Sequence, residues 1–273
     1  MLSVVQAGEV RVAEDADFRK LKNLSDEHKE WKQEYSKNNT TVWTKNNDVS
    51  DFKMVKVRTV FEDVEAETLY DVLHDPDYRK TWDQSMLEGY EICALNPNND
   101  IGYYALKCPS PLRNRDFVTQ RSWLDMGNEK YIINHSVNHE ECPPRKGFIR
   151  GISYFTGYLI RKLDGAKTQL TYVSQSDPKG KLPSWAVNKA TKMLGAKIMS
   201  RIHKACKNYP KWKGKHNPHL KPWIYPEQMT LPRLNMSQIK PLNAGVSCES
   251  IDESGVQEED IDMGDFMEDD KDS

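Results

Sequence analysis

The fold class is first visible in "KMVKVRTVF", residues 53–61. In this stretch Val55, Val57 and Phe61 alternate with positions that include two positively charged side chains, which is the period of a half-buried strand. Similar strand patterns follow, and short turn-rich pieces such as "NPNND" and "DGAK" join most of them. Because short turns connect antiparallel neighbours, the pattern predicts an antiparallel meander. The expected strands are 42–44, 52–61, 90–95, 102–108, 117–125, 130–137, 148–163 and 167–174.

Helical patterns flank and interrupt these strands. Ala16–Tyr35 repeats apolar residues at steps of three and four, and Glu65–His74 does the same. Asp75 can then cap a second short helix that has Pro76 at its first position. The longest pattern, Pro183–Tyr209, has one apolar stripe and lysines on the other faces. This order of elements predicts an α+β fold in which a curved antiparallel sheet wraps around the C-terminal helix.

The composition changes at the ends of the chain. Residues 1–15 are expected to form an N-terminal arm. Residues 210–247 carry six prolines and few apolar runs, which predicts an extended linker. Residues 248–273 are acidic and poor in apolar side chains, which predicts a disordered tail. Residues 178–226 hold twelve Lys or Arg and no acid, whereas residues 249–273 hold twelve acids and one Lys. A basic block therefore faces an acidic tail in a chain whose net charge is only -2.

Several classes of protein lack support in this sequence. The five cysteines are scattered without a CxxC, which suits a reducing compartment, and no His or Cys spacing fits a metal. The N-terminus is a poor signal peptide, and no stretch approaches the roughly 18 apolar residues of a membrane span. No GxSxG, Walker or GxGxxG motif occurs. We expect a cytosolic protein with no catalytic residues, no metal, no cofactor and no nucleic-acid partner, and any membrane contact should be peripheral.

The stretch "DPDYRKTWDQ", residues 75–84, holds the main candidate site. Arg79 and Asp83 stand four residues apart, so they face each other on a helix. An exposed pair of this kind contributes well under about 1 kcal/mol. If the pair is buried, one carboxylate cannot accept from all five guanidinium donors, and the remaining donors suit a phosphate. Spacing alone leaves both interpretations open.

Four motifs decide between them: "DYRKTWDQ", "KCPSPLRNRDFV", "GFIRGISY" and "LPSWAVNKATKM". Together they resemble the START family of lipid-transfer domains, and most closely its phosphatidylcholine-transfer-protein subgroup. The resemblance covers residues 16–209. It implies a helix-grip fold that encloses one phospholipid in a cavity. It also implies that Arg79 binds the lipid phosphate and that Asp83 supports the guanidinium.

The resemblance further implies an aromatic cage for the lipid headgroup. Two of the three cage positions correspond to Tyr104 and Tyr154, whereas the third is Leu73. Thr156 stands where the subgroup has a glutamine. A reduced cage weakens cation–π selectivity for trimethylammonium, so we expect phosphatidylethanolamine to be accepted as well as phosphatidylcholine. The alternative is that the strand aromatics only fill the core.

A closed carrier has to open at a membrane. We expect the loop 109–116 and the helix 183–209 to move, with apolar tips inserting and lysines facing the anionic surface. The alternative is that the helix only covers the core. The expected membrane contacts are Leu112, Trp185, Lys189 and Lys192.

The acidic tail suggests regulation. Tethered acids can compete with the membrane for the basic block. "SIDE" places Ser250 three residues before Glu253, which is the pattern of an acid-directed protein kinase, and a phosphate there would add about -1.5 to -2 charges. The alternative is that the tail only aids solubility. Two other functions remain open: a lipid sensor or adaptor that signals through its tail, and an acyl-thioester hydrolase.

Overall fold

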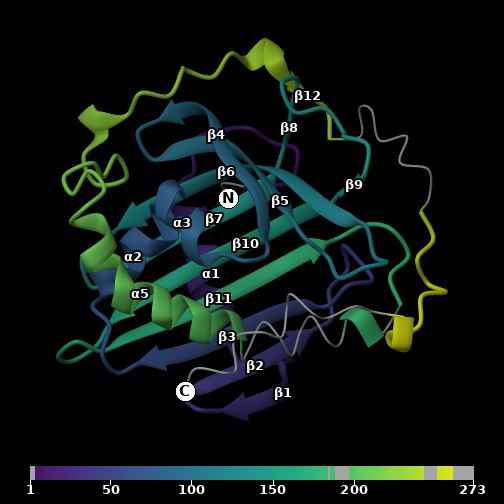
Figure 1. Cartoon of the computed structure of the whole chain (residues 1–273), viewed down its shortest axis with the longest axis horizontal. Coiled ribbons are helices and arrows are strands. Elements are labelled where there is room, and N and C mark those ends of the chain that lie inside the picture. The colour runs from purple at the N-terminus through teal and green to yellow at the C-terminus, as the bar shows by residue number, and fades with distance from the viewer. Residues whose placement is uncertain (1–3, 184, 188–196, 243–250, 261–273) are drawn as a thin grey trace.

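The computed structural model describes residues 4–183, 185–187, 197–242 and 251–260 (Figure 1). Within these ranges the main sheet has the order β1-β2-β3-β11-β10-β7-β6-β5-β4, and all these neighbours are antiparallel. The predicted α+β class and antiparallel meander are therefore confirmed. The strands are β1 (Lys32–Lys37), β2 (Thr40–Lys45), β3 (Met54–Phe61), β4 (Met86–Asn96), β5 (Asn99–Leu106), β6 (Asn114–Asp125), β7 (Glu129–Ser136), β9 (Phe148–Arg150), β10 (Ile152–Lys162) and β11 (Thr168–Asp177).

Helices cover both faces of this sheet (Figure 1). We call the face under α2, α3 and α5 the inner face and the face under α1 the outer face. Residues 185–187 are also helical, and residues 188–196 of the expected 183–209 helix lie outside the described ranges. The α-helices with printed bounds are α1 (Asp15–Asp26), α2 (Ala66–His74), α3 (Pro76–Trp82) and α5 (Met199–Lys213), and the 3-10 turns are η2 (Pro226–Gln228), η3 (Met236–Gln238) and η4 (Glu258–Asp260).

The first helix is shorter than its apolar pattern predicts. It ends at Asp26, and the end of the expected 16–35 helix is instead the start of β1, which begins at Lys32. Lys56 on β3 donates to the carbonyls of Leu24 and Glu27, so it satisfies acceptors that a helix leaves open at its C-terminus. A cation at this end also interacts favourably with the helix dipole. Glu30 then takes a positive φ of 65°, where the chain turns toward the sheet.

On the inner face, Asp75 joins α3 to α5. Its Oδ1 accepts from the backbone N of Tyr78 at 3.0 Å, which is the helix cap that the sequence predicts. Its Oδ2 accepts from the Tyr209 hydroxyl at 3.1 Å and from Lys213 Nζ at 2.8 Å. The Tyr78 hydroxyl donates to the carbonyl of Ala205 at 2.7 Å. These bonds fix the short helix that carries Arg79.

The predicted extended linker, residues 210–247, is wrong for the residues that the structure describes. α5 continues to Lys213, and residues 214–242, which we call the strap, run along the domain (Figure 1). Trp223 Nε1 donates to Asp71 at 2.8 Å, and β12 (Ile239–Lys240) pairs with β8 (Asn138–His139). The prolines keep the strap irregular, but its indole and its strand edge find partners on the domain. Residues 243–247 lie outside the described ranges.

The two ends of the chain also contact the domain. In the expected arm, Val5 is buried and its backbone N donates to Asp17 at 2.7 Å. In the expected disordered tail, residues 251–256 contact the domain and Glu253 is buried. That part of the tail prediction is therefore wrong, because Glu253 finds a buried cation, as described below. Residues 248–250 and 261–273 lie outside the described ranges.

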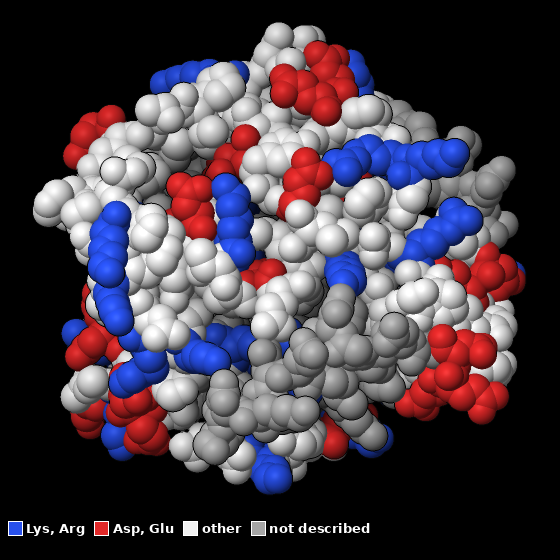
Figure 2. Space-filling view, viewed as in Figure 1, with Lys and Arg blue, Asp and Glu red and all other residues white. Residues whose placement is uncertain are grey.

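In the folded chain, acidic side chains from other segments lie among the lysines and arginines of the basic block, residues 178–226. Figure 2 shows Lys and Arg side chains along the side that α5 occupies, with acidic side chains among them. Asp63, for example, accepts from His203 Nε2 at 2.6 Å and pairs with Lys207 at 2.8 Å. Hydrogen bonds from Lys207 and His203 lower the pKa of Asp63 to about 2. Part of the positive charge on α5 is therefore already neutralised by the fold.

Candidate binding site

Arg79 lies on α3 with its guanidinium toward the inner face of the sheet. Its Nε donates to Asp83 Oδ2 at 3.1 Å, and the Tyr104 hydroxyl of β5 donates to the same oxygen at 3.0 Å. The guanidinium carbon lies 5.3 Å from the centre of the Tyr104 ring and 5.7 Å from that of Trp82. The structure therefore brings together three of the predicted site residues, and the two ring contacts suit a cation.

The Arg79–Asp83 pair is partly buried: it is not fully exposed to solvent, and protein atoms do not cover it completely. The Arg79 side chain is 29% exposed and the Asp83 side chain 10%. Burial is nevertheless the largest influence on the pKa of Arg79 and acts to lower it, whereas Tyr158, Tyr104 and Asp83 raise it, and the net shift is upward. Arg79 thus stays a cation deep in the fold, with part of its surface uncovered by protein atoms. This arrangement rules out the simple surface ion pair.

Polar side chains of β10 and β11 line the inner face near Arg79. Tyr158 and Tyr172 are register partners whose ring centres lie 5.0 Å apart. The neighbouring Thr156 Oγ1 lies 2.8 Å from Ser153 Oγ and 3.4 Å from Ser174 Oγ. Burial raises the pKa of both tyrosines, so their hydroxyls stay neutral and can donate. Thr156 therefore belongs to a row of hydroxyls on the same face as the Arg79 site.

Two of the expected cage residues, Tyr154 and Leu73, are not among the described partners of Arg79. Tyr154 stands four residues before Tyr158 on β10, which separates their backbones by roughly 13 Å at about 3.3 Å per residue. It lines a pocket of about 350 Å³ together with the 47–52 loop, Asp177 and Lys179. Leu73 is buried within the inner apolar cluster. Neither side chain is bonded to Arg79 or Asp83 among the described contacts, so their headgroup roles stay predictions.

The sequence analysis missed Phe117 and Arg121, which lie on β6. Phe117 is the register partner of Tyr104 and therefore points to the same face of the sheet. Its ring lies over Gly151, where an added Cβ would come within 2.4 Å of the ring. Arg121 pairs with Asp100, and its guanidinium carbon lies 5.2 Å from the centre of the Trp123 ring.

The alternation of side chains along β6 could have indicated these residues from the sequence. Phe117, Arg121 and Trp123 stand at even spacing, so one strand face holds them all. Burial acts to lower the pKa of Arg121, but Asp100 and Glu91 raise it and the net shift is upward. Arg79 lies close enough for its charge to act in the lowering direction. Arg79 and Arg121 therefore both lie on the inner face. Of these, Arg121 has two acidic partners, Asp100 and Glu91.

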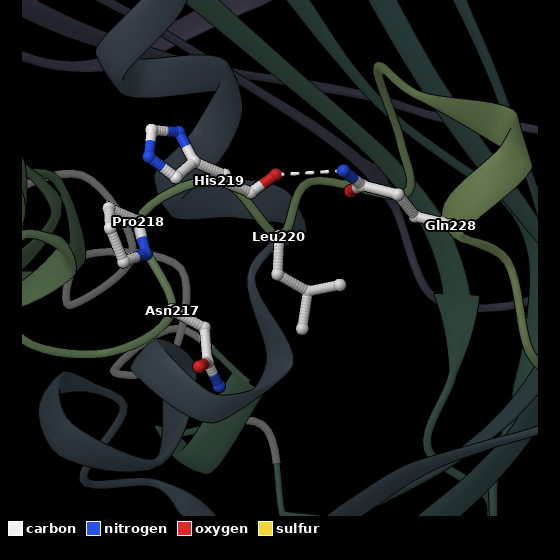
Figure 3. A pocket seen from close by; sticks show the side chains of 5 residues that line it. All are labelled: Asn217, Pro218, His219, Leu220 and Gln228. Carbon is white, nitrogen blue, oxygen red and sulfur yellow. Dashed lines mark hydrogen bonds between the residues drawn. The ribbon is translucent and has the colours of Figure 1, made fainter.

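A separate pocket of about 470 Å³ opens on the strap (Figure 3). Asn217, Pro218, His219, Leu220 and Gln228 line it, and Gln228 Nε2 donates to the carbonyl of His219 at 2.9 Å. None of these five is among the residues that surround Arg79. We therefore do not assign the lipid to this pocket.

The expected membrane contacts are only partly described. Leu112 is partly exposed in the 109–116 loop. Trp185 is partly covered, and its Nε1 donates to the carbonyl of Val256 at 2.9 Å. Lys189, Lys192 and Ser250 lie outside the described ranges. None of the described helices is long and apolar enough to cross a membrane. The same ranges hold no group of three or more His, Cys, Asp or Glu side chains placed to bind a metal.

The sequence of this chain is similar to those of known proteins. The START domain family model matches residues 11–213. The chain is 46% identical to mouse START domain-containing protein 10 over 250 residues, which is 91% of this chain and 86% of that protein. It is 35% identical to mouse phosphatidylcholine transfer protein over 161 residues, 57% of this chain and 74% of that protein.

Solved structures agree. The crystal structure of human STARD10 superimposes with a TM-score of 0.81 at 44% identity, covering 87% of this chain and 97% of that chain. Human StAR-related lipid transfer protein 5 shares the fold, with a TM-score of 0.65 at 20% identity over 70% of this chain and 93% of that chain. The family model covers residues 11–213, and the large antiparallel sheet with its helices matches the solved structures. The chain therefore belongs to the START-domain family of lipid-transfer proteins.

Proposed function

We propose that this protein binds one phosphatidylcholine or phosphatidylethanolamine molecule and carries it between membranes, with the lipid phosphate on Arg79. The supporting observation is the incomplete pairing of Arg79. Its guanidinium has five donors, and the described partners are the Asp83 carboxylate and the Tyr158 hydroxyl. A phosphodiester offers two oxygens in the planar geometry that an arginine fork prefers. Asp83 holds the fork in place and partly offsets its burial.

The neighbouring residues fit a headgroup of mixed character. The Tyr104 ring can attract a quaternary ammonium through its π face. A primary ammonium also has N–H donors, and the hydroxyls of Thr156 and Ser174 can accept them. These features support the acceptance of phosphatidylethanolamine beside phosphatidylcholine. The two remaining expected cage positions, Tyr154 and Leu73, are retained in this proposal as headgroup residues.

Transfer requires a shielded lipid and a way to open. Moving about 30 methylenes from a membrane into water costs on the order of 20 kcal/mol, at roughly 0.8 kcal/mol for each CH₂. A carrier in the cytosol would replace those contacts with its inner face and open during a transient contact with a membrane. We assign this opening to the 109–116 loop and the 183–209 helix. The assigned membrane contacts are Leu112, Trp185, Lys189 and Lys192.

No catalytic step is part of this proposal. The site offers a cation, neutral hydroxyls and aromatic rings, which bind and orient a lipid without forming a bond to it. Phosphorylation of Ser250 by an acid-directed kinase remains a further proposal. It would add negative charge beside the tail segment that contacts the domain.

Lipid analysis and a transfer assay test the proposal. The full chain is incubated with vesicles of mixed phospholipids and re-isolated, and its bound lipids are identified by mass spectrometry. We expect one diacyl phospholipid per chain, with choline and ethanolamine headgroups both present, and transfer of both to acceptor vesicles. Bound phospholipid without transfer would indicate a sensor or adaptor. Absence of phospholipid would contradict the proposal.

A further inference from the structure

The tail segment 251–256 lies beside the stretch that leads into the C-terminal helix (Figure 1). The backbone N of Lys181 donates to the carbonyl of Ile251 at 3.1 Å, and the backbone N of Glu253 donates back to the carbonyl of Lys181 at 3.1 Å. The Trp185 indole N–H donates to the carbonyl of Val256 at 2.9 Å. The segment is therefore bound by Lys181 at one end and by Trp185 at the other.

The Glu253 carboxylate forms the centre of this contact. Its Oε2 accepts from Arg115 Nη2 at 2.6 Å, and its Oε1 accepts from the backbone N of Arg113 at 2.7 Å. Both charged side chains are almost fully buried, Arg115 at 2% and Glu253 at 7% exposure. Within the described ranges Glu253 is the one carboxylate bonded to Arg115. A buried guanidinium without a counter-charge is strongly destabilising, so Glu253 completes the site.

The other donors of Arg115 join two segments. Nη1 donates to the carbonyl of Arg113 at 2.6 Å, within the 109–116 loop. Nε and Nη2 donate to the carbonyls of Pro178 and Lys179 at 3.3 and 3.2 Å. The last three residues of the expected 109–116 loop belong to β6, so Arg115 is a strand residue. It ties the loop that precedes β6 to the start of the region that leads into the C-terminal helix.

Gly180 allows the tail to approach this closely. It has a positive φ of 70°, and an added Cβ would lie 3.3 Å from Arg115 Nη2 and 3.4 Å from the carbonyl oxygen of Ile251. A side chain there would be strained and would crowd both partners. The backbone is thus shaped for the arginine and for the tail together.

We propose that residues 251–256 are an intramolecular latch, in which Glu253 fastens the 109–116 loop to residues 178–187. The contacts of the latch are those described above, whereas its effect on lipid exchange rests on the proposed function. Release of the segment uncovers Arg115 and the Trp185 N–H. Phosphate groups of an anionic membrane then offer Arg115 the oxygen ligand that Glu253 supplies in the closed state. The membrane opens the carrier by replacing Glu253 at Arg115.

Hydrogen–deuterium exchange of the full chain without lipid tests the latch directly. Glu253→Gln keeps the size of the side chain and removes its charge. We expect exchange in residues 109–116 and 178–187 to rise by roughly tenfold or more, the size expected for the loss of a charge-assisted hydrogen bond. The matched control is Asp252→Asn, because Asp252 is 49% exposed and pairs with Lys181 at 3.3 Å. We expect it to change exchange by less than about twofold.

Transfer between vesicles of phosphatidylcholine and phosphatidylserine gives the functional readout. Glu253→Gln should transfer lipid faster than Asp252→Asn, and the difference should persist at high salt because the pair is buried. Equal exchange in the two variants would overturn the latch. Faster exchange in Glu253→Gln, with no transfer even by the natural chain, would keep the latch and reject the carrier. Should Glu253→Gln fail to fold, Trp185→Phe removes only the bond to Val256. Unchanged exchange of residues 251–256 in that variant would overturn the latch.

Discussion

Arg79 and Arg150 are both paired with an aspartate inside the domain, but their donors are used differently. Arg150 forms a two-pronged pair with Asp116, at 2.9 and 3.0 Å, and also donates to the carbonyl of Cys142. Arg79 meets Asp83 through Nε alone, and a larger part of its side chain is exposed. A guanidinium with an acceptor at each of its three nitrogens, as in Arg150, holds the fold together, whereas one with donors to spare can hold a ligand.

The family motifs contain both kinds of arginine. "GFIRGISY" carries Arg150 and "DYRKTWDQ" carries Arg79. The Tyr103 hydroxyl also donates to Asp116 at 3.0 Å, so the Arg150 site is closed by protein groups. A shared motif is therefore not evidence of ligand contact by itself. The number of engaged donors separates the two roles.

The largest expected effect is a loss of protein stability when the Arg150–Asp116 pair is broken. Arg150→Met leaves Asp116 as a buried carboxylate without its cation, which should lower the free energy of unfolding by about 3–5 kcal/mol. Urea unfolding followed by circular dichroism measures this loss. The matched variant Arg79→Met should lose about 1–2 kcal/mol, because Asp83 keeps the Tyr104 hydroxyl as a donor. Equal losses in the two variants would remove the distinction between the sites.

A second effect extends the comparison to the outer face. Lys56 is fully buried, caps the C-terminus of α1 and lies 4.3 Å from the centre of the Trp31 ring. Lys56→Met should lower the free energy of unfolding by about 2 kcal/mol, because the carbonyls of Leu24 and Glu27 lose a charged donor. Phospholipid binding should be unaffected. A loss of bound lipid at unchanged stability would indicate that the lipid binds near Lys56 on the outer face, and not at Arg79 on the inner face.

A third, smaller effect concerns headgroup choice. Thr156→Val removes a hydroxyl on the inner face while nearly keeping the volume of the side chain. The bound ratio of phosphatidylethanolamine to phosphatidylcholine should fall by about fivefold, the size of one neutral hydrogen bond. Mass spectrometry of bound lipid measures it. Thr171→Val is the control, since Thr171 is a buried residue of β11 that accepts from Arg58 at 3.3 Å. The same ratio in both variants would exclude Thr156 from the headgroup site.

The smallest effect is a dependence of stability on pH. Burial lowers the pKa of Lys56 from 10.5 to about 8. Between these values the unfolded chain binds more protons than the folded one, so stability should rise with pH across this window. The rise should be modest, because two carbonyls and the Trp31 ring favour the charged form. Comparing unfolding of the natural chain with that of Lys56→Met isolates this group. An identical pH slope in the two proteins would contradict the assignment.

The strand alternation and short turns were sufficient to predict the antiparallel sheet, and Asp75-Pro76 was sufficient to predict the capped α3 helix. The early end of α1 was not predictable, because the side chain that caps it comes from β3, far along the chain. For the same reason the strap looked like a linker. Its anchors, Trp223 on Asp71 and β12 on β8, exist only once the sheet is formed.

The candidate site was predictable in part. Spacing and motif placed Arg79 beside Asp83, but only the sheet register brings Tyr104 to the same oxygen. The register also sets Tyr158 beside Tyr172, which the motifs do not indicate. Glu253 looked like one acid among many in a polar tail. Its burial against Arg115 depends on a contact across 138 residues of sequence.

The most direct test of this account measures bound phospholipid and stability together for Arg79→Gln. The full chain is equilibrated with mixed phospholipid vesicles and re-isolated, and the lipid per chain is determined by mass spectrometry beside a urea unfolding curve. The account predicts at least about tenfold less bound lipid, with a loss of unfolding free energy of no more than about 1–2 kcal/mol, because Asp83 keeps the Tyr104 hydroxyl as a donor. Retention of the lipid together with a large loss of stability would show that Arg79 is a structural residue like Arg150.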